Sequence, residues 1–140
     1  MSHFTKMSVD YKGQYEPELL MAIEEAMGVK PEVHENPVSL LDYTGRASDK
    51  NTGTMKAEKC HIVLRQDNLP GTTNDCGWRR TEEGGYEAFL DTTGVSEAKQ
   101  GLISQSYALA VAEKKFKAEG YSVTRKQGQH GRIQLEAVKY

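Results

Sequence analysis

Cysteine is scarce in this chain, and its spacing argues against the usual structural uses of the residue. Only Cys60 and Cys76 occur among 140 residues, and they form no C-x-x-C pair. A closed zinc site needs four soft ligands, and Cys60 and His61, as neighbours on a strand, would point to opposite faces. A disulfide between adjacent strands is conceivable, but such bonds are rare in a reducing cytosol. We therefore expect free, partly buried thiols and no metal site.

The chain also lacks long apolar runs and a strong excess of either charge. No stretch approaches the roughly 20 apolar residues of a membrane span. The first residues, MSHFTKMSVDYKG, show no apolar core before a small-residue cleavage site. These absences predict a cytoplasmic protein. The formal net charge of −2 gives no overall case for nucleic-acid binding, although a local basic patch stays open.

Recognisable catalytic motifs are missing as well. The sequence contains no G-x-S-x-G, Walker A or G-x-G-x-x-G motif. The histidines are scattered along the chain, and a catalytic role for His3 or His61 would need partner groups that the spacing does not reveal. We expect a protein that is not an enzyme and that uses no cofactor.

The patterns that are present describe one globular domain, residues 1–140. Hydrophobic residues make up 37% of the chain, and its length is sufficient for a hydrophobic core. Helices are predicted at 16–28 and 96–120, where apolar residues recur at helical spacing. Gly28 suits the end of the first helix, and Ser96 suits the N-cap of the second.

Strands alternate with these helices. They are predicted at 3–9, 39–45, 59–66, 77–81, 86–91, 121–126 and 132–140, with a polar, aperiodic loop at 45–58. The order predicts an α+β fold, in which an antiparallel sheet carries two amphipathic helices packed on one face, with ferredoxin-like character. The residues expected to be buried in its core are Leu19, Ile23, Ile62, Leu64, Ile103, Val111, Val123 and Leu135.

The segment DCGWRRTEEGGYEAFLD (75–91) is the most distinctive candidate site. On a strand, Trp78 and Arg80 share one face and Arg79 takes the other. Tryptophan can stack on a base, and arginine offers a planar fork that matches phosphate. The predicted ligand-binding set is Trp78, Arg79, Arg80, Arg65, Tyr107, Lys59, Arg46 and His3. In the alternative, Trp78 packs in the core and the arginines form surface ion pairs with nearby glutamates.

Several short motifs carry a resemblance to a known family. They are the opening MSHF, the central IVLRQ, the GW…YE hairpin, the tyrosine of the second helix followed by GY, and a closing G-x-I-x-L pattern. Together they resemble the uncharacterised family typified by the hypothetical chloroplast reading frame 35 protein, which has plastid, bacterial and phage members. The resemblance spans nearly the whole chain but departs in segments 45–58 and 77–91. It implies a fold more than a function, and it implies an ATPase of the AAA class as a candidate partner.

These observations predict a non-catalytic binding protein that captures a small anionic ligand such as a nucleotide or cyclic nucleotide. A phage-encoded sponge against host nucleotide signalling would fit this description. The alternative is a protein-interaction module, for example an accessory factor of an AAA-class ATPase. Because unpaired strand edges invite pairing, we also expect a homodimer formed through sheet edges or through an uncovered sheet face.

Overall fold

Antiparallel strand pairing organises the chain, whose computed structural model describes residues 4–7, 14–43, 45, 58–71, 74–127 and 133–139. The elements, in chain order, are β1 (Phe4–Met7), α1 (Glu16–Met27), β2 (Glu32–Ser39), β3 (Lys59–Leu64), the 3-10 turn η1 (Gln66–Asn68), β4 (Cys76–Arg80), β5 (Tyr86–Asp91), α2 (Glu97–Ala118), β6 (Tyr121–Gln127) and β7 (Ile133–Lys139). The predicted α+β class is confirmed.

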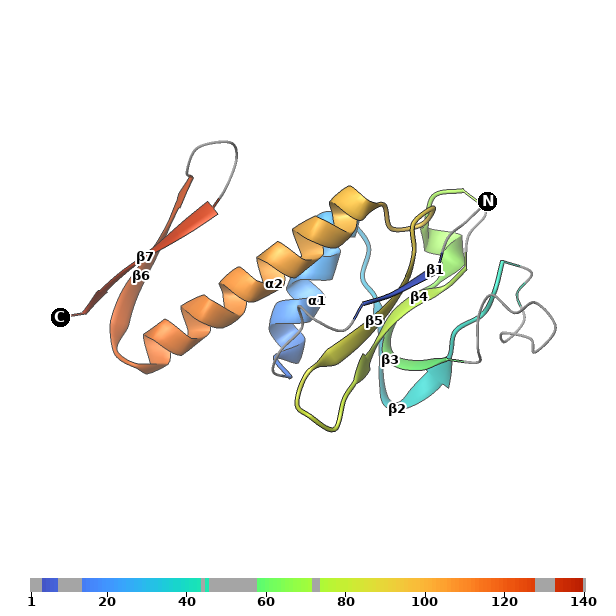
Figure 1. The fold of residues 1–140 in the computed structure, drawn as a ribbon, viewed down its shortest axis with the longest axis horizontal. Helices are drawn as coiled ribbons and strands as arrows, with labels where there is room; N and C mark the ends of the chain where they lie inside the picture. The colour runs from blue at the N-terminus through green and yellow to red at the C-terminus, as the bar shows by residue number, and fades with distance from the viewer. Residues whose placement is uncertain are drawn as a thin grey trace.

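Five of the strands form one sheet in the order β1-β5-β4-β3-β2, and β6 and β7 form a second, two-stranded sheet. Strands β2 to β5 are consecutive neighbours, and β1 closes the far edge against β5. Both helices contribute to the same core on one face of the larger sheet, as predicted. The likeness to a ferredoxin fold is limited to this layering, because β6 and β7 stand in a sheet of their own (Figure 1).

The helix boundaries follow the predicted capping residues. Gly28 ends α1 in the left-handed conformation, with φ of 72°, and its N–H donates to the carbonyl of Glu24 at 2.7 Å. The Ser96 hydroxyl accepts from the N–H of Lys99 at 3.3 Å and caps the start of α2. Neither described helix combines the length and apolar character that crossing a membrane would require.

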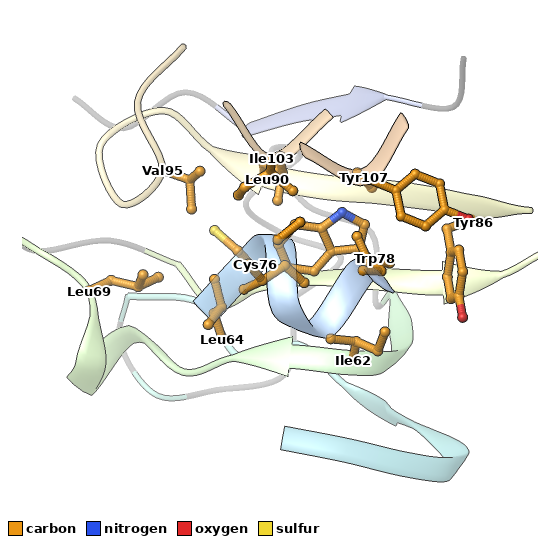
Figure 2. Close-up of a cluster of buried hydrophobic side chains, with 14 of the residues drawn as sticks. Ile62, Leu64, Leu69, Cys76, Trp78, Tyr86, Leu90, Val95, Ile103 and Tyr107 are labelled. Carbon is orange, nitrogen blue, oxygen red and sulfur yellow. The ribbon is translucent and has the colours of Figure 1, made fainter. Parts of the chain in front are cut away.

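The main core lies between the helices and the larger sheet (Figure 2). The core positions predicted on the two helices and on β3 are confirmed as buried: Leu19, Ile23, Ile62, Leu64, Ile103 and Val111. Leu102, an apolar residue of α2 next to the buried Ile103, is 48% exposed. The stripe of this helix is therefore narrower than the sequence suggested.

The opposite face of the sheet is buried as well, by a smaller cluster of Leu40, Cys60, Val63 and Phe89. In a regular strand Cys60 and Ile62 would share a face, but Cys60 packs with Val63 on this second face. Gly77 makes the arrangement feasible, since a β-carbon there would lie 2.7 Å from Cys60 Cβ and 2.9 Å from the backbone oxygen of Ile62. The lack of a side chain at Gly77 is thus a packing requirement.

The second strand begins earlier in the chain than predicted. We expected residues 39–45 to form a strand after Pro37, whereas β2 spans Glu32–Ser39 and includes this proline. Its pairing with β3 shifts register between Val33 and Val38. An edge strand with an irregular register tolerates a residue that lacks an N–H donor, which explains why Pro37 does not end it.

The β6–β7 hairpin, which we call the arm, lies at the C-terminal end of α2, away from the larger sheet (Figure 1). None of the side chains described in β6 and β7 is buried. The prediction that Val123 and Leu135 belong to the core is therefore wrong; both are only half-buried. Their alternation marks an apolar face of the arm, not a strand of the central sheet.

Truncation experiments should separate the core from the arm. We expect Ile23→Ala and Leu64→Ala each to lower the free energy of unfolding by roughly 2–5 kcal/mol, because both leave cavities in a fully packed site. Val123→Ala, which removes a half-exposed side chain, should cost less than about 1 kcal/mol. Denaturant titration would measure all three, and equal losses would contradict the separation of core and arm.

Candidate functional site

Two of the predicted ligand-binding residues, Trp78 and Tyr107, lie in the core. Trp78 is fully buried, and its indole Nε1 has no hydrogen-bond partner among the described residues. Tyr107 is buried too; its hydroxyl accepts a hydrogen bond from the N–H of Tyr15 at 3.4 Å, and its ring meets Tyr86 edge-on. Figure 2 shows these rings inside the cluster of buried side chains. Neither aromatic face is open to a ligand, in agreement with the alternative of core packing.

The two arginines of β4 point to opposite faces of the sheet, as predicted. Arg79 donates to Glu58 and Glu87, each at 2.7 Å. Burial opposes the charge of Arg79, but these hydrogen bonds outweigh that effect and raise its pKa. Arg80 lies on the helix side, where its Nη2 is 3.4 Å from the carboxylate of Glu16. Both guanidinium groups are therefore already engaged with carboxylates of the chain itself.

The other predicted residues do not complete a pocket around β4. Lys59 begins β3 and Arg65 directly follows its last residue, so the two are six residues apart, which corresponds to roughly 20 Å along a strand. His3 and Arg46 lie outside the described residues. The described members of the set are thus divided among the core, the two faces of β4 and the two ends of β3.

Arg65 belongs to a structural clamp around the fully buried carboxylate of Asp75. The carboxylate accepts from Arg65 Nη1 at 2.7 Å, from the N–H of Gln66 at 2.8 Å and from the N–H of Leu41 at 2.9 Å. Burial opposes the charge of Arg65, but hydrogen bonds to Glu32 and Asp75 outweigh it and raise the pKa of the guanidinium. The clamp joins the ends of β2, β3 and β4.

A shallow pocket of about 300 Å³ lies beside this clamp. Tyr43, Arg65, Asp67 and Asp75 contribute to its lining. One guanidinium therefore faces two carboxylates, so the local charge is unfavourable for an anion. Arg65 is the one described member of the predicted set that lines this pocket, and its charge is already neutralised there.

A second pocket, also shallow and more open to solvent than the first, has a volume of about 290 Å³. It lies between the C-terminal half of α2 and β6, and we call it the junction pocket. Its lining consists of Ala110, Glu113, Lys114, Lys117 and Arg125. The lining thus has three cationic side chains and one carboxylate, the reverse of the charge balance at Arg65, and one of the cations, Lys114, pairs with a carboxylate outside the lining. Lys114, Lys117 and Arg125 remain 56%, 59% and 46% exposed, respectively, so their charges stay accessible.

Glu113 binds two of the three cations of the junction pocket. Its carboxylate accepts from Arg125 Nε at 2.8 Å and from Lys117 Nζ at 3.0 Å, while Lys114 pairs with Glu18 of α1 at 3.2 Å. The hydrogen bond from Arg125, followed by that from Lys117, lowers the pKa of Glu113. The carboxylate is therefore ionised at neutral pH, and it is shared by two cations.

Sequence reasoning missed this site for an identifiable reason. The spacing of Glu113, Lys114 and Lys117 within one helix places them within a turn of one another, a signal for a charged helix end. Arg125 enters only because the chain turns at Gly120 and β6 folds back beside α2. The fourth charged group thus depends on tertiary structure.

The two cysteines are free and buried, as expected. Desolvation raises the pKa of each thiol, Cys60 and Cys76, to about 12, so neither is a reactive thiolate at neutral pH. Within the described part of the chain, no three His, Cys, Asp or Glu side chains gather as a metal site.

The chain belongs to the family described as "Protein of unknown function (DUF1257)", which matches residues 26–136. The matched span contains all of α2 and most of the arm, and with them every residue that lines the junction pocket. No curated protein and no solved structure matches the chain. The family description names no activity, so the function has to be argued from the chemistry of the site.

Removing the charged partner of a buried carboxylate should destabilise the fold. We expect Arg65→Ala to lower the free energy of unfolding by about 1.5–3 kcal/mol, because Asp75 would lose a charge-assisted hydrogen bond. Arg80→Ala is the matched control and should cost at most about 1 kcal/mol, since its partly exposed pair with Glu16 is long. Denaturant titration would compare the variants, and a larger loss for Arg80→Ala would contradict the role of the clamp.

Proposed function

We propose that this protein is a non-catalytic binding protein that captures a small anionic ligand in the junction pocket. The observation that carries the proposal is the charge balance of the lining, which contains three cations, Lys114, Lys117 and Arg125, and the single carboxylate of Glu113. The proposal keeps the ligand class expected from the sequence but moves the site from β4 to the junction of α2 and β6.

An incoming anion can replace Glu113 as the partner of Lys117 and Arg125 at a small cost in free energy. Exposed ion pairs contribute little to stability, so the contacts of Glu113 with Lys117 and Arg125 can loosen at small cost. An anion would then receive charge-assisted hydrogen bonds from ammonium and guanidinium donors, and arginine can bind a phosphate through two parallel bonds. The predicted pocket around Arg79 lacks this property, since that guanidinium is half-buried between two carboxylates.

The lining supports recognition of phosphate rather than of a nucleobase. No aromatic side chain is among the residues that line the pocket, and stacking on a base needs such a ring. A nucleotide or cyclic nucleotide would therefore be held through its phosphate. The volume, about 290 Å³, lies near the lower end of the range for small-molecule sites.

The lining also supports binding without catalysis. A general base works best when its pKa lies near the operating pH, whereas the pKa of Glu113 is lowered by its hydrogen bonds with Arg125 and Lys117. A carboxylate that stays ionised is a weak proton acceptor.

The proposal extends to the setting of the protein: we propose that it acts in the cytoplasm and that it is a phage-encoded sponge for a signalling nucleotide. We also propose, from the shared short motifs, that the chain belongs to the group typified by the chloroplast reading frame 35 protein.

A protein-interaction module is the second candidate, and the arm favours it. An isolated two-stranded hairpin is marginally stable in water, yet no side chain described in the arm is buried. A partner protein that covered the half-buried Val123 and Leu135 would supply the missing packing. An ATPase of the AAA class, which the resemblance implies, is one such partner.

Calorimetric titration with ATP, a cyclic dinucleotide and inorganic pyrophosphate would test anion capture. We expect the double variant Lys117→Ala with Arg125→Ala to weaken binding by about 10- to 100-fold, since each charge-assisted hydrogen bond contributes roughly 1.5–3 kcal/mol before compensation. The matched control, Lys115→Ala with Lys126→Ala, removes the same charge from neighbouring positions outside the lining. It should bind nearly as well as the parent. Parent binding no tighter than millimolar, or equal losses in both double variants, would refute the proposal.

Native mass spectrometry of the protein purified from its source cells would test the second candidate. If a partner covers the arm, the chain should occur in a stoichiometric heteromeric complex that Val123→Asp dissociates. The half-exposed position tolerates the change better than a core position would, because little packing is lost there. A complex that survives Val123→Asp would place the partner elsewhere.

A further inference from the structure

The arm is a sheet of two strands, and its two edges differ in the contacts that they make with the rest of the chain. The described ion pair and ring contact between α2 and the arm, Glu113 with Arg125 and Phe116 with Tyr121, are both made with β6. The outer edge of β7 pairs with no other described strand. Figure 1 shows the arm beyond the larger sheet, at the end of α2.

Strand β7 carries two charged residues, Glu136 and Lys139, but it lacks the other features that usually protect an edge. Its sequence, IQLEAVK, contains no proline or glycine, and its register with β6 is uninterrupted over seven residue pairs. Natural edge strands are usually short, bulged or interrupted by proline or by charges. By comparison, β2 at the edge of the larger sheet carries both Pro37 and a register shift.

The two faces of the arm also differ. Directly opposed residues share a face, so Val123 with Ala137 and Arg125 with Leu135 lie on one side. Val123, Ala137 and Leu135 are half-buried, whereas the residues of the other face are exposed. A strand added to the edge of β7 must continue this division, because a slip of one residue would turn apolar side chains toward the polar face.

We propose that β7 pairs antiparallel with β7 of a second copy of this chain, about a two-fold axis at Leu135. The result is a four-stranded sheet in the order β6-β7-β7-β6, with the apolar faces of both copies on the same side. Such an interface is isologous, since the same surface serves both protomers. This inference is independent of anion binding, because the junction pocket lies on the side of β6.

Charge and polarity favour this register over its neighbours. With the axis at Leu135, Gln134 lies opposite Glu136 of the other copy, so an amide N–H can donate to a carboxylate, and Ile133 lies opposite Ala137. With the axis at Glu136, two like charges would face each other directly, which is destabilising. An axis between the two residues would set Leu135 against Glu136 and mismatch the faces. Of these three registers, the one with the axis at Leu135 makes β7 self-complementary.

The register leads to a specific charge experiment. Within one chain, Gln134 is opposed to Lys126, so Gln134→Glu adds a favourable neighbour to the monomer. Across the proposed axis the same change sets the introduced carboxylate against Glu136 of the other copy, twice per dimer. Gln134→Lys has the opposite effect, because it pairs an ammonium group with Glu136 of the other copy. Ser122→Glu is the matched control, since it adds the same charge on the same face but on β6, away from the axis.

Analytical ultracentrifugation of the full chain over a range of micromolar concentrations would measure the effect. We expect a dimer for the parent, a dimerisation Kd about 10-fold weaker for Gln134→Glu, a tighter one for Gln134→Lys, and little change for Ser122→Glu, given two like-charge pairs per dimer. Circular dichroism would check that each variant folds. A monomeric parent at high micromolar concentration, or equal weakening by Gln134→Glu and Ser122→Glu, would overturn the proposal. A parent that is monomeric alone but joins a different protein through β7 would overturn it too, without affecting anion capture.

Discussion

The buried carboxylate of Asp75 is the constraint on which the architecture of the larger sheet depends. It accepts hydrogen bonds from segments that follow β2 and β3, and it directly precedes β4. A fully buried charge is tolerated only when it is paired and hydrogen-bonded, so the ends of these strands must meet in one arrangement. Next to it, the buried carboxylate of Asp91 accepts from the backbone and side chain of Asn74 and from the N–H of Thr93. These carboxylates fix one end of the sheet through specific hydrogen bonds rather than through apolar contact.

The larger sheet is buried by the helices on one face and by a small cluster on part of the other. The helices cover one face through Ile62, Trp78 and their neighbours, and a smaller cluster around Phe89 is buried on the other. The burial explains why Trp78, the feature of the sequence that most suggested ligand stacking, serves the core. It also explains why Arg79 pairs with carboxylates, since a half-buried cation needs local partners.

The arm obeys a different constraint. It extends from α2 without a packed core of its own, and one of its charged residues, Arg125, lies at the junction with the helix. A region with few buried contacts and accessible charge is suited to binding. The junction pocket and the free edge of β7 are therefore the two surfaces proposed to bind, one a small anion and the other a second copy of the chain.

Local patterns in the sequence were sufficient for the class of fold, both helices with their capping residues, the β4–β5 hairpin and the opposite orientation of Arg79 and Arg80. These features depend on residues close in the chain, whose periodicity and conformational preferences act locally. Patterns could not show that Trp78 faces the helices, that Cys60 is out of phase with Ile62, or that Val123 and Leu135 lie outside the core. A strand's apolar face is the same whether it joins the central sheet or stands apart, so its neighbours decide its burial. The junction pocket also depends on tertiary structure: Glu113 and Lys117 are one helical turn apart, but only the fold brings Arg125 beside them.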